Sequence, residues 1–258
     1  MEKIRKYPRT PHIQGSKLQS GDEDLSQIPF SQIKGRRIVV EEKIDGANSG
    51  ISFSSDGKLL LQSRGHYLQG GYRERHYNLL KTWATIHTSE LYSVLGNRYI
   101  MYGEWMYAKH KIYYDTLPSY FIEFDIYDKH NDVFLDTSSR HNLIKDLNIP
   151  SVPLLKIGAF NSLEELTSLI QNSLYKSDKC NENLQETISI LGLNGEEILS
   201  QTDTSSLMEG LYIKIEEDGK VVDRMKFVRY SFTQPESVTN WLDKPIIPNK
   251  LAKDKKFI

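Results

Sequence analysis

Three Asp-Gly pairs between short apolar runs constrain the fold of this chain more than any other feature. They are Asp45-Gly46, Asp56-Gly57 and Asp218-Gly219. Aspartate and glycine favour tight turns because they tolerate the backbone conformations that a short hairpin needs. We therefore expect residues 37–43, 50–53 and 59–63 to form an antiparallel meander. By the same rule, residues 210–216 should pair with residues 221–229.

Aromatic and β-branched runs predict further strands, and helical periodicity appears between them. Residues 98–105 and 119–127 are rich in tyrosine, phenylalanine and isoleucine, which favours strands. Residues 72–95 indicate a mostly helical stretch. Apolar positions three and four apart predict helices over residues 138–147 and 163–175. The fold class expected is α+β, with antiparallel sheets and helical insertions.

The 258 residues suit one large domain with a substantial core. We expect residues 1–35 to be an irregular segment packed on the domain, because they are rich in glycine, proline, serine and charge. The regular elements indicate a domain over residues 36–230, within which residues 137–192 are mainly helical. Residues 231–258 contain three prolines and five lysines, and we expect a basic tail or a covering segment.

Composition excludes several classes of protein. A single cysteine, Cys180, excludes an internal disulfide framework and a zinc site with several cysteines. The presence of a single cysteine fits a protein of a reducing, cytoplasmic compartment. No apolar run approaches the roughly 20 residues that cross a bilayer, so we expect no membrane association. The first residues lack the apolar stretch of a secretory signal.

Charge is unevenly distributed along the chain. The net charge of −1 argues against a protein that coats nucleic acid indiscriminately. Residues 1–37, however, carry eight basic and four acidic side chains, and residues 224–258 carry eight and three. These basic ends are equally consistent with local patches for a polyanion and with solvated tails.

The strongest chemical motif is Lys43-Ile44-Asp45-Gly46, at the end of a predicted strand. Alone, the motif is equally consistent with a chemically active lysine and with a strand-ending turn that carries an exposed lysine. Further motifs follow it in order, and they are Ser63-Arg64-Gly65, Tyr102-Gly103-Glu104-Trp105, residues 121–126 (FIEFDI), residues 209–214 (EGLYIK) and Arg224-Met225-Lys226.

In this order and spacing, the motifs resemble those of the covalent nucleotidyltransferase superfamily, which contains ATP-dependent ligases and mRNA capping enzymes. The string E-K-I-D-G-A-N at residues 42–48 and the F-D-I string at residues 124–126 are most similar to RNA ligases related to the second RNA ligase of phage T4. The resemblance extends over about residues 38–230.

The resemblance implies an ATP-grasp-like nucleotidyltransferase domain that uses ATP and Mg²⁺ or Mn²⁺. The implied activity joins RNA 3′-OH and 5′-phosphate ends through a lysyl-AMP and an RNA-adenylate. About 30 residues follow the last motif, so we expect no C-terminal OB-fold. A protein partner is a possible source of further RNA contacts. NAD⁺ is not expected as the donor, because such ligases carry an extra N-terminal domain.

The resemblance also implies roles for individual residues. The implied catalytic residues are Lys43, Glu209, Lys214 and Lys226. The implied nucleotide-binding residues are Glu42, Arg64, Glu104, Phe124, Lys214, Arg224 and Lys226. The implied RNA-binding residues are Asn48 and Arg64, and the implied metal ligand is Glu209. Arg224 departs from the family pattern, which has a lysine there, and arginine cannot mimic a compact ammonium.

The chemistry of an amine nucleophile sets one further expectation. A lysine must lose its proton before it attacks phosphorus, yet its ordinary pKa is near 10.4. Positive charge from Lys214, Lys226 and a metal ion is expected to lower the pKa of Lys43. The glycine of the Asp45-Gly46 turn is expected to let the backbone approach the nucleotide closely.

Several other functions remain open at this stage. A DNA ligase or a GTP-dependent capping guanylyltransferase would have the same fold and chemistry. A non-catalytic RNA-binding protein on that scaffold is a different class. A protein-modifying nucleotidyltransferase is a further alternative on which the sequence is silent.

Overall fold

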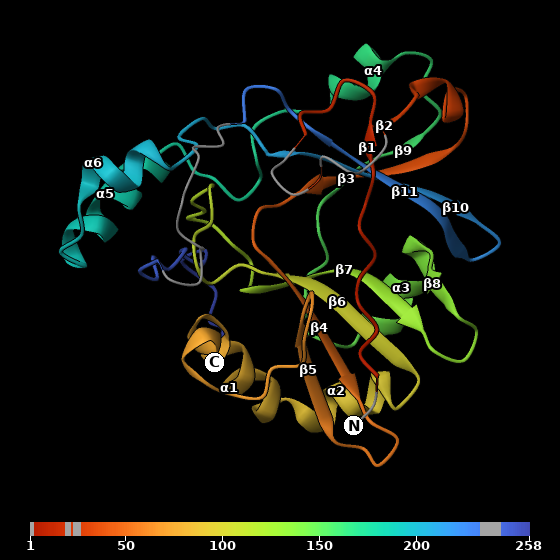
Figure 1. The fold of residues 1–258 in the computed structure, drawn as a ribbon, viewed down its shortest axis with the longest axis horizontal. Helices are drawn as coiled ribbons and strands as arrows, with labels where there is room; N and C mark the ends of the chain where they lie inside the picture. The colour runs from red at the N-terminus through yellow and green to blue at the C-terminus, as the bar shows by residue number, and fades with distance from the viewer. Residues whose placement is uncertain (1–2, 19–21, 23–26, 233–243) are drawn as a thin grey trace.

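The computed structural model describes residues 3–18, 22, 27–232 and 244–258. Its strands form one hydrogen-bonded sheet that divides into two halves. Figure 1 shows the first half below the second. In pairing order the first half contains β5 (Leu59–Ser63), β4 (Ala47–Phe53), β6 (Tyr99–Trp105), β7 (Phe121–Asp128) and β8 (Val133–Leu135). All of these strands pair antiparallel.

The second half continues the same sheet. In pairing order it contains β11 (Lys220–Val228), β10 (Gly210–Glu217), β3 (Ile38–Lys43) and β9 (Leu154–Gly158). The two halves are joined where β8 pairs with the start of β11. The short strands β1 (His12–Ile13) and β2 (Gln27–Ile28) are attached in parallel, β1 to β11 and β2 to β1.

Helices cover each half of the sheet. The described helices are η1 (Phe30–Gln32), η2 (Tyr72–Tyr77), α1 (Asn78–Ile86), α2 (Thr88–Leu95), α3 (Thr137–Ile144), α4 (Leu163–Thr167), α5 (Cys180–Ile190) and α6 (Gly195–Ser200). Helices α1 and α2 pack on the first half, and α4 packs on the second. Figure 1 shows α5 and α6 together at one side of the molecule.

Each half has its own apolar core. The first core includes Phe53, Leu80 and Trp105, and all three side chains are almost fully buried. The second includes Val40 and Ile213, which lie opposite each other in the β3–β10 pair. Burial of such side chains stabilises the fold by about 1.5–3 kcal/mol each. The two halves thus have separate apolar cores within one continuous sheet.

The β10–β11 hairpin is confirmed, but the predicted meander is wrong at its first step. Strand β4 pairs with β5 through the Asp56-Gly57 turn, as expected. Strand β3 pairs instead with β10 and β9. The residues that follow Lys43 therefore carry the chain from the second half of the sheet to the first. Long-range pairing, which turn chemistry does not encode, selected the neighbours of β3.

The helix predicted over residues 163–175 is longer than the helix observed there, α4 (Leu163–Thr167). Helix α4 begins as expected, because Ser162 Oγ accepts a hydrogen bond from the backbone N–H of Glu165 (3.1 Å). It ends at Thr167 because the chain then extends, and Asn172 forms a bridge with Leu207. Strand β9 lies inside the stretch predicted to be mainly helical, and its pairing with β3 decides its conformation.

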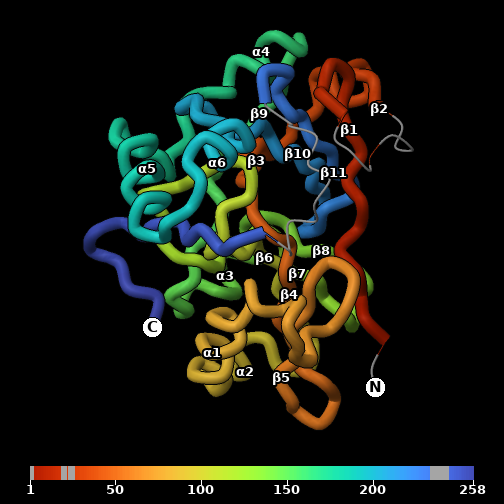
Figure 2. The backbone as a smooth tube through the Cα atoms, turned by 60° about the vertical axis from the view of Figure 1, so that its left-hand side comes forward, coloured from red at the N-terminus to blue at the C-terminus, as the bar shows by residue number. Residues whose placement is uncertain are grey.

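Residues 244–258 pack on the rest of the chain rather than projecting from it, with Ile247 in the cluster of α5 and Phe257 against the first half of the sheet. The Phe257 ring stacks on Trp83, with a centroid separation of 5.3 Å. Figure 2 shows this blue segment crossing the molecule beside the first half of the sheet. In the part of the chain that the structure describes, no helix is long and apolar enough to cross a membrane.

Candidate active site

Lys43 and Glu209 meet where the chain leaves β3 and crosses from the second half of the sheet to the first. Lys43 is the last residue of β3, and its register partner in β10 is Gly210. Glu209 comes directly before Gly210, so strand pairing brings the two side chains together. Lys43 Nζ donates a hydrogen bond to Glu209 Oε2 at 2.6 Å. The Lys43 side chain is 19% exposed and that of Glu209 is 1% exposed.

The glycines beside these two residues are required by close packing. A Cβ at Gly210 would lie 1.9 Å from the carbonyl oxygen of Phe227 in β11. A Cβ at Gly46 would lie 2.7 Å from Met106 Sδ and 2.8 Å from the carbonyl oxygen of Trp105. The glycine after Asp45 is therefore needed for contact with the end of β6, and its expected part in the approach to a nucleotide stays a prediction.

Asp45 anchors a loop rather than lining the site. Its Oδ2 accepts hydrogen bonds from the backbone N–H groups of Lys111 (2.7 Å) and Ile112 (2.8 Å). Its own backbone N–H donates to the Tyr114 hydroxyl (2.9 Å). These bonds fix the residues after Lys43 against the segment that follows β6, and they hold the lysine at the crossover.

The pKa of Lys43 differs from expectation. Burial by itself lowers the pKa of this ammonium group. The negative charge of Glu209 and its hydrogen bond raise the pKa, and together the raising effects exceed that of burial, so the pKa lies above its ordinary value. Asp45 and Glu104 act in the same direction. The carboxylates around Lys43 therefore favour its ammonium form.

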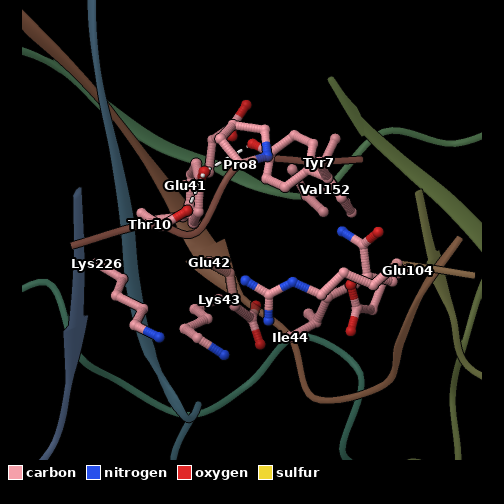
Figure 3. A pocket seen from close by; sticks show the side chains of 14 residues that line it. Tyr7, Pro8, Thr10, Glu41, Glu42, Lys43, Ile44, Glu104, Val152 and Lys226 are labelled. Carbon is pink, nitrogen blue, oxygen red and sulfur yellow. Dashed lines mark hydrogen bonds between the residues drawn. The ribbon is translucent and has the colours of Figure 1, made fainter. Parts of the chain in front are cut away.

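A cavity of about 180 Å³ adjoins Lys43. It is lined by Tyr7, Pro8, Thr10, Glu41, Glu42, Lys43, Ile44, Asn48, Arg64, Glu104, Phe124, Val152, Tyr212 and Lys226. Seven of the residues singled out from the sequence are among them, although they come from five strands and one loop. Figure 3 shows the ammonium groups of Lys43 and Lys226 directed to the same side of the cavity.

Two carboxyl groups that line the cavity have raised pKa values. Burial raises the pKa of Glu104 to about 8, and the charges of Asp45 and Glu209 add to the effect against the opposing charge of Lys43. Glu104 Oε1 accepts from the backbone N–H of Gly46 at 3.1 Å. Burial also raises the pKa of Glu42 to about 7, although a hydrogen bond opposes it.

The Glu42 side chain is oriented by Ser173, which lies in the extended stretch after helix α4. Its Oε1 accepts a hydrogen bond from Ser173 Oγ at 2.5 Å. Its Oε2 is buried and has no hydrogen-bond partner within the described part of the chain. Its backbone N–H donates to Pro153 O at 2.9 Å. The side chain of Glu42 thus presents a buried, unsatisfied polar atom.

Asn48, Phe124 and Arg64 also line the cavity. Asn48 lies beside Glu104 in the β4–β6 pair, and its amide oxygen is buried without a hydrogen-bond partner among the described residues. Phe124 packs edge-on against Tyr7, with a centroid separation of 5.1 Å. Arg64 follows β5 and is exposed. A buried amide oxygen without a partner, an aromatic ring and a cation are features of a site for a polar ligand with an aromatic base.

Lys214 does not line the cavity, which differs from its expected contact with phosphates. Its side chain is fully buried, and its Nζ donates to the carbonyl oxygen of Phe124 at 2.6 Å. The same ammonium forms ion pairs at 3.0 Å with Glu41 and with Asp125. The alternation of β10 directs Lys214 into the sheet interface, where these three acceptors satisfy it. Lys214 supports the backbone of Phe124 from behind.

Arg224 also points away from the cavity lining. Its guanidinium lies 3.9 Å from the centroid of the Phe134 ring and 3.7 Å from Asp125. Stacking on an aromatic face suits a planar guanidinium better than an ammonium. The arginine at this position therefore has a structural explanation, and its expected part in nucleotide binding stays a prediction.

Sequence reasoning did not anticipate the N-terminal segment as part of the site. Tyr7, Pro8 and Thr10 line the cavity together with Tyr212 of β10. The Tyr7 hydroxyl donates to Asp125 Oδ2 at 2.5 Å and lies 2.7 Å from the Tyr212 hydroxyl. The only available signal was the Tyr-Pro pair, which favours an extended backbone but does not indicate where it docks.

Comparison with solved structures finds proteins that share this architecture. Naegleria gruberi RNA ligase with PPi is similar with a TM-score of 0.54 and 20% identity, over 87% of this chain and 56% of that chain. A mutant of the same ligase with ATP and Mn is similar with a TM-score of 0.55 and 19% identity, over 89% and 57%. This chain therefore spans a little more than half the length of these proteins, and the similarity shows a shared fold.

Comparison of sequences gives the family. No curated protein matches the chain significantly. The model of the RNA ligase family matches residues 36–228, a stretch that begins just before β3 and ends with β11. That match includes Lys43, Glu104, Glu209 and Lys226 and most of the chain. The chain thus belongs to the RNA ligase family.

Proposed function

We propose that this protein is an ATP-dependent RNA ligase that joins RNA 3′-OH and 5′-phosphate ends. The observation that carries the proposal is the position of Lys43, whose amine lies at the edge of the cavity and bonds to Glu209 at 2.6 Å. Membership of the RNA ligase family supports the reaction class. The similar Naegleria ligase, solved with ATP and Mn, supports the choice of nucleotide and of a divalent metal.

In the first step, Lys43 Nζ attacks the α-phosphorus of ATP. The amine loses its proton, a P–N bond forms, the bond from the α-phosphorus to the bridging oxygen breaks, and pyrophosphate leaves. In the second, a phosphate oxygen of the RNA 5′ end attacks the same phosphorus, and Lys43 leaves as the P–N bond breaks. In the third, the RNA 3′-OH attacks the activated 5′-phosphate, and AMP leaves.

The cavity residues suit the parts of the nucleotide. Phe124 offers an aromatic surface to the base, and Lys214 holds its backbone. Glu104 is positioned to accept a hydrogen bond from a ribose hydroxyl. Lys226 and Arg64 carry positive charge for phosphates. Asn48, with its unsatisfied amide oxygen, is proposed to orient the RNA 3′-OH.

A divalent cation fits the donor set of this site. Among the described residues there is no group of three or more histidine, cysteine and acidic side chains that could enclose a metal. Mg²⁺ usually binds through one or two carboxylates plus substrate phosphates and waters. Glu209 supplies such a carboxylate beside Lys43. When bound, the cation neutralises phosphate charge and offsets the carboxylates that raise the pKa of Lys43.

Labelled nucleotides test the proposal. Incubation with α-labelled ATP and Mg²⁺ is expected to label the protein, and Lys43→Ala is expected to abolish the label. Lys58→Ala is the matched control, because Lys58 is exposed in the β4–β5 turn, and it should label like the wild type. Labelling by GTP alone would favour a capping enzyme. Absence of labelling by either nucleotide would favour a non-catalytic RNA-binding protein.

A panel of nucleic-acid ends tests the substrate. We expect sealing to tolerate a DNA strand that carries the 5′-phosphate better than a DNA strand that carries the 3′-OH. Equal sealing of all-DNA nicks would contradict the choice of RNA and favour a DNA ligase. A protein partner that adds RNA contacts stays a prediction, which sealing by the purified chain alone tests.

A further inference from the structure

Lys226 is connected to a chain of buried polar groups that begins in the N-terminal segment. Strand β1 pairs in parallel with β11, and the register partner of Lys226 is His12. The backbone N–H of Lys226 donates to Pro11 O at 2.9 Å. Lys226 Nζ donates to the carboxylate of Asp22. The cavity wall at Lys226 is therefore built from residues before the first motif.

Asp22 is itself held by a buried histidine. His12 Nε2 lies 3.2 Å from Asp22 Oδ2, and the His12 side chain is fully buried. Arg9 adds a longer contact, 3.4 Å from Asp22 Oδ1. The carboxylate is thus shared between one ammonium, one guanidinium and one imidazole, and it cannot turn away from Lys226 without losing the bond to His12.

The second ring nitrogen of His12 fixes the direction of these bonds. His12 Nδ1 lies 2.7 Å from Ser16 Oγ. Ser16 Oγ also accepts a hydrogen bond from the backbone N–H of Val228 (2.8 Å), so its own proton is available for Nδ1. With Nδ1 as the acceptor, Nε2 carries the proton and donates it to Asp22. Burial and the nearby charge of Lys226 lower the pKa of His12, in agreement with a neutral ring.

We propose that His12 is a positioning residue for ATP binding: it holds Asp22, and Asp22 fixes the ammonium of Lys226 at the wall of the cavity. A free lysine side chain has four rotatable bonds, and a phosphate would have to restrict them on binding. The hydrogen-bonded chain of Ser16, His12 and Asp22 restricts these rotations of the Lys226 side chain before ATP binds. The inference rests on the proposed function, because it assumes that phosphates of ATP meet Lys226.

The test measures the dissociation constant of ATP in a Lys43→Ala background, where no covalent step can follow binding. His12→Leu removes the donor to Asp22 at similar volume, and it is expected to weaken ATP binding by about tenfold, the usual effect of losing a hydrogen bond to a charged group. His12→Gln keeps an amide donor and is expected to restore most of the affinity. His130→Leu, at an exposed turn, is the matched control and should bind ATP normally.

A double-mutant cycle separates positioning from a general structural role. When Lys226 is already alanine, His12→Leu should weaken ATP binding by less than about twofold, because the residue that it positions is absent. Additive effects of the two substitutions would overturn the proposal. Equal affinities of His12→Leu and the parent protein would also overturn it.

Asp22→Ala covers the case in which His12→Leu does not fold. It is expected to weaken ATP binding as well, because Lys226 loses its anchor. Tighter binding would instead show that the Asp22 carboxylate competes with phosphate, and it would overturn the proposal. If the Lys43→Ala parent does not bind ATP, the proposed function fails first, so the two failures are distinguishable.

Discussion

Lys43 and Glu209 lie 166 positions apart in the chain, and their side chains are joined by a hydrogen bond of 2.6 Å. The β3–β10 register brings them together, and Gly210 allows β11 to pack close behind. Lys43 stays protonated, because Glu209, Asp45 and Glu104 together stabilise the ammonium more than burial destabilises it. This relationship determines how the amine responds to pH and to metal.

Glu209→Gln is expected to lower the pKa of Lys43, because it removes the charge that raises the value most. The measurement is the pH dependence of Lys43 acylation in metal-free protein, followed by peptide mass spectrometry. The reaction requires the neutral amine, so its midpoint should move to lower pH in the variant. Glu186→Gln, at an exposed ion pair, should leave the midpoint unchanged. An unchanged midpoint in Glu209→Gln would contradict the assignment.

Glu42 is expected to make the protein less stable as pH rises from 4.5 to 7. In the folded state its pKa is about 7, against an ordinary value of 4.5. Between these values the folded protein keeps a proton that the unfolded chain has released, so the free energy of unfolding falls with rising pH, by at most about 3 kcal/mol.

Urea unfolding at pH 5 and pH 8 measures this effect. Glu42→Gln should show a smaller difference between the two pH values than the wild type. Glu196→Gln, which is exposed, should show the wild-type difference. Identical pH dependence in the wild type and in Glu42→Gln would show that Glu42 titrates normally in the folded protein.

Gly210→Ala is expected to destabilise the protein by more than about 3 kcal/mol, because its Cβ has no room beside the carbonyl oxygen of Phe227. Gly158→Ala in the edge strand β9 meets nothing closer than 3.8 Å, and it should change stability by less than about 1 kcal/mol. Thermal and urea unfolding of the two variants compare them. Similar stabilities would mean that the β10–β11 contact relaxes easily.

Arg140→Met is expected to destabilise the protein by about 3–5 kcal/mol, because it leaves buried carboxylates unpaired. Arg140 is fully buried, donates twice to Glu123 at 2.9 Å and pairs with Glu41. Since Glu41 also pairs with Lys214, the substitution should disturb the support of Phe124 and weaken ATP binding.

Arg36→Met removes an exposed ion pair with Glu217 and serves as the control for Arg140→Met. It should change stability by less than about 1 kcal/mol, because exposed pairs contribute little. A similar loss in both variants, measured by urea unfolding, would argue against a special role for the buried network.

Local sequence patterns were sufficient for most single elements. The Asp56-Gly57 and Asp218-Gly219 turns produced the two hairpins that they predicted. Most aromatic and apolar runs became strands close to their predicted bounds, because side-chain alternation and turn chemistry act within a few residues. The ordered motifs also identified seven residues of the cavity lining, since the resemblance carried information that no single residue contains.

Only the tertiary structure decided which strands pair and which charges meet. It placed Lys43 at a crossover between the two halves of the sheet, buried Lys214 behind Phe124, and brought Tyr7 and His12 to the site from the N-terminal segment. The physical reason is that pairing register, desolvation and charge compensation depend on residues distant in the chain. A turn motif or a periodic pattern depends only on residues nearby in the sequence. The position of a buried cation depends on acceptors that the fold brings together from distant parts of the chain.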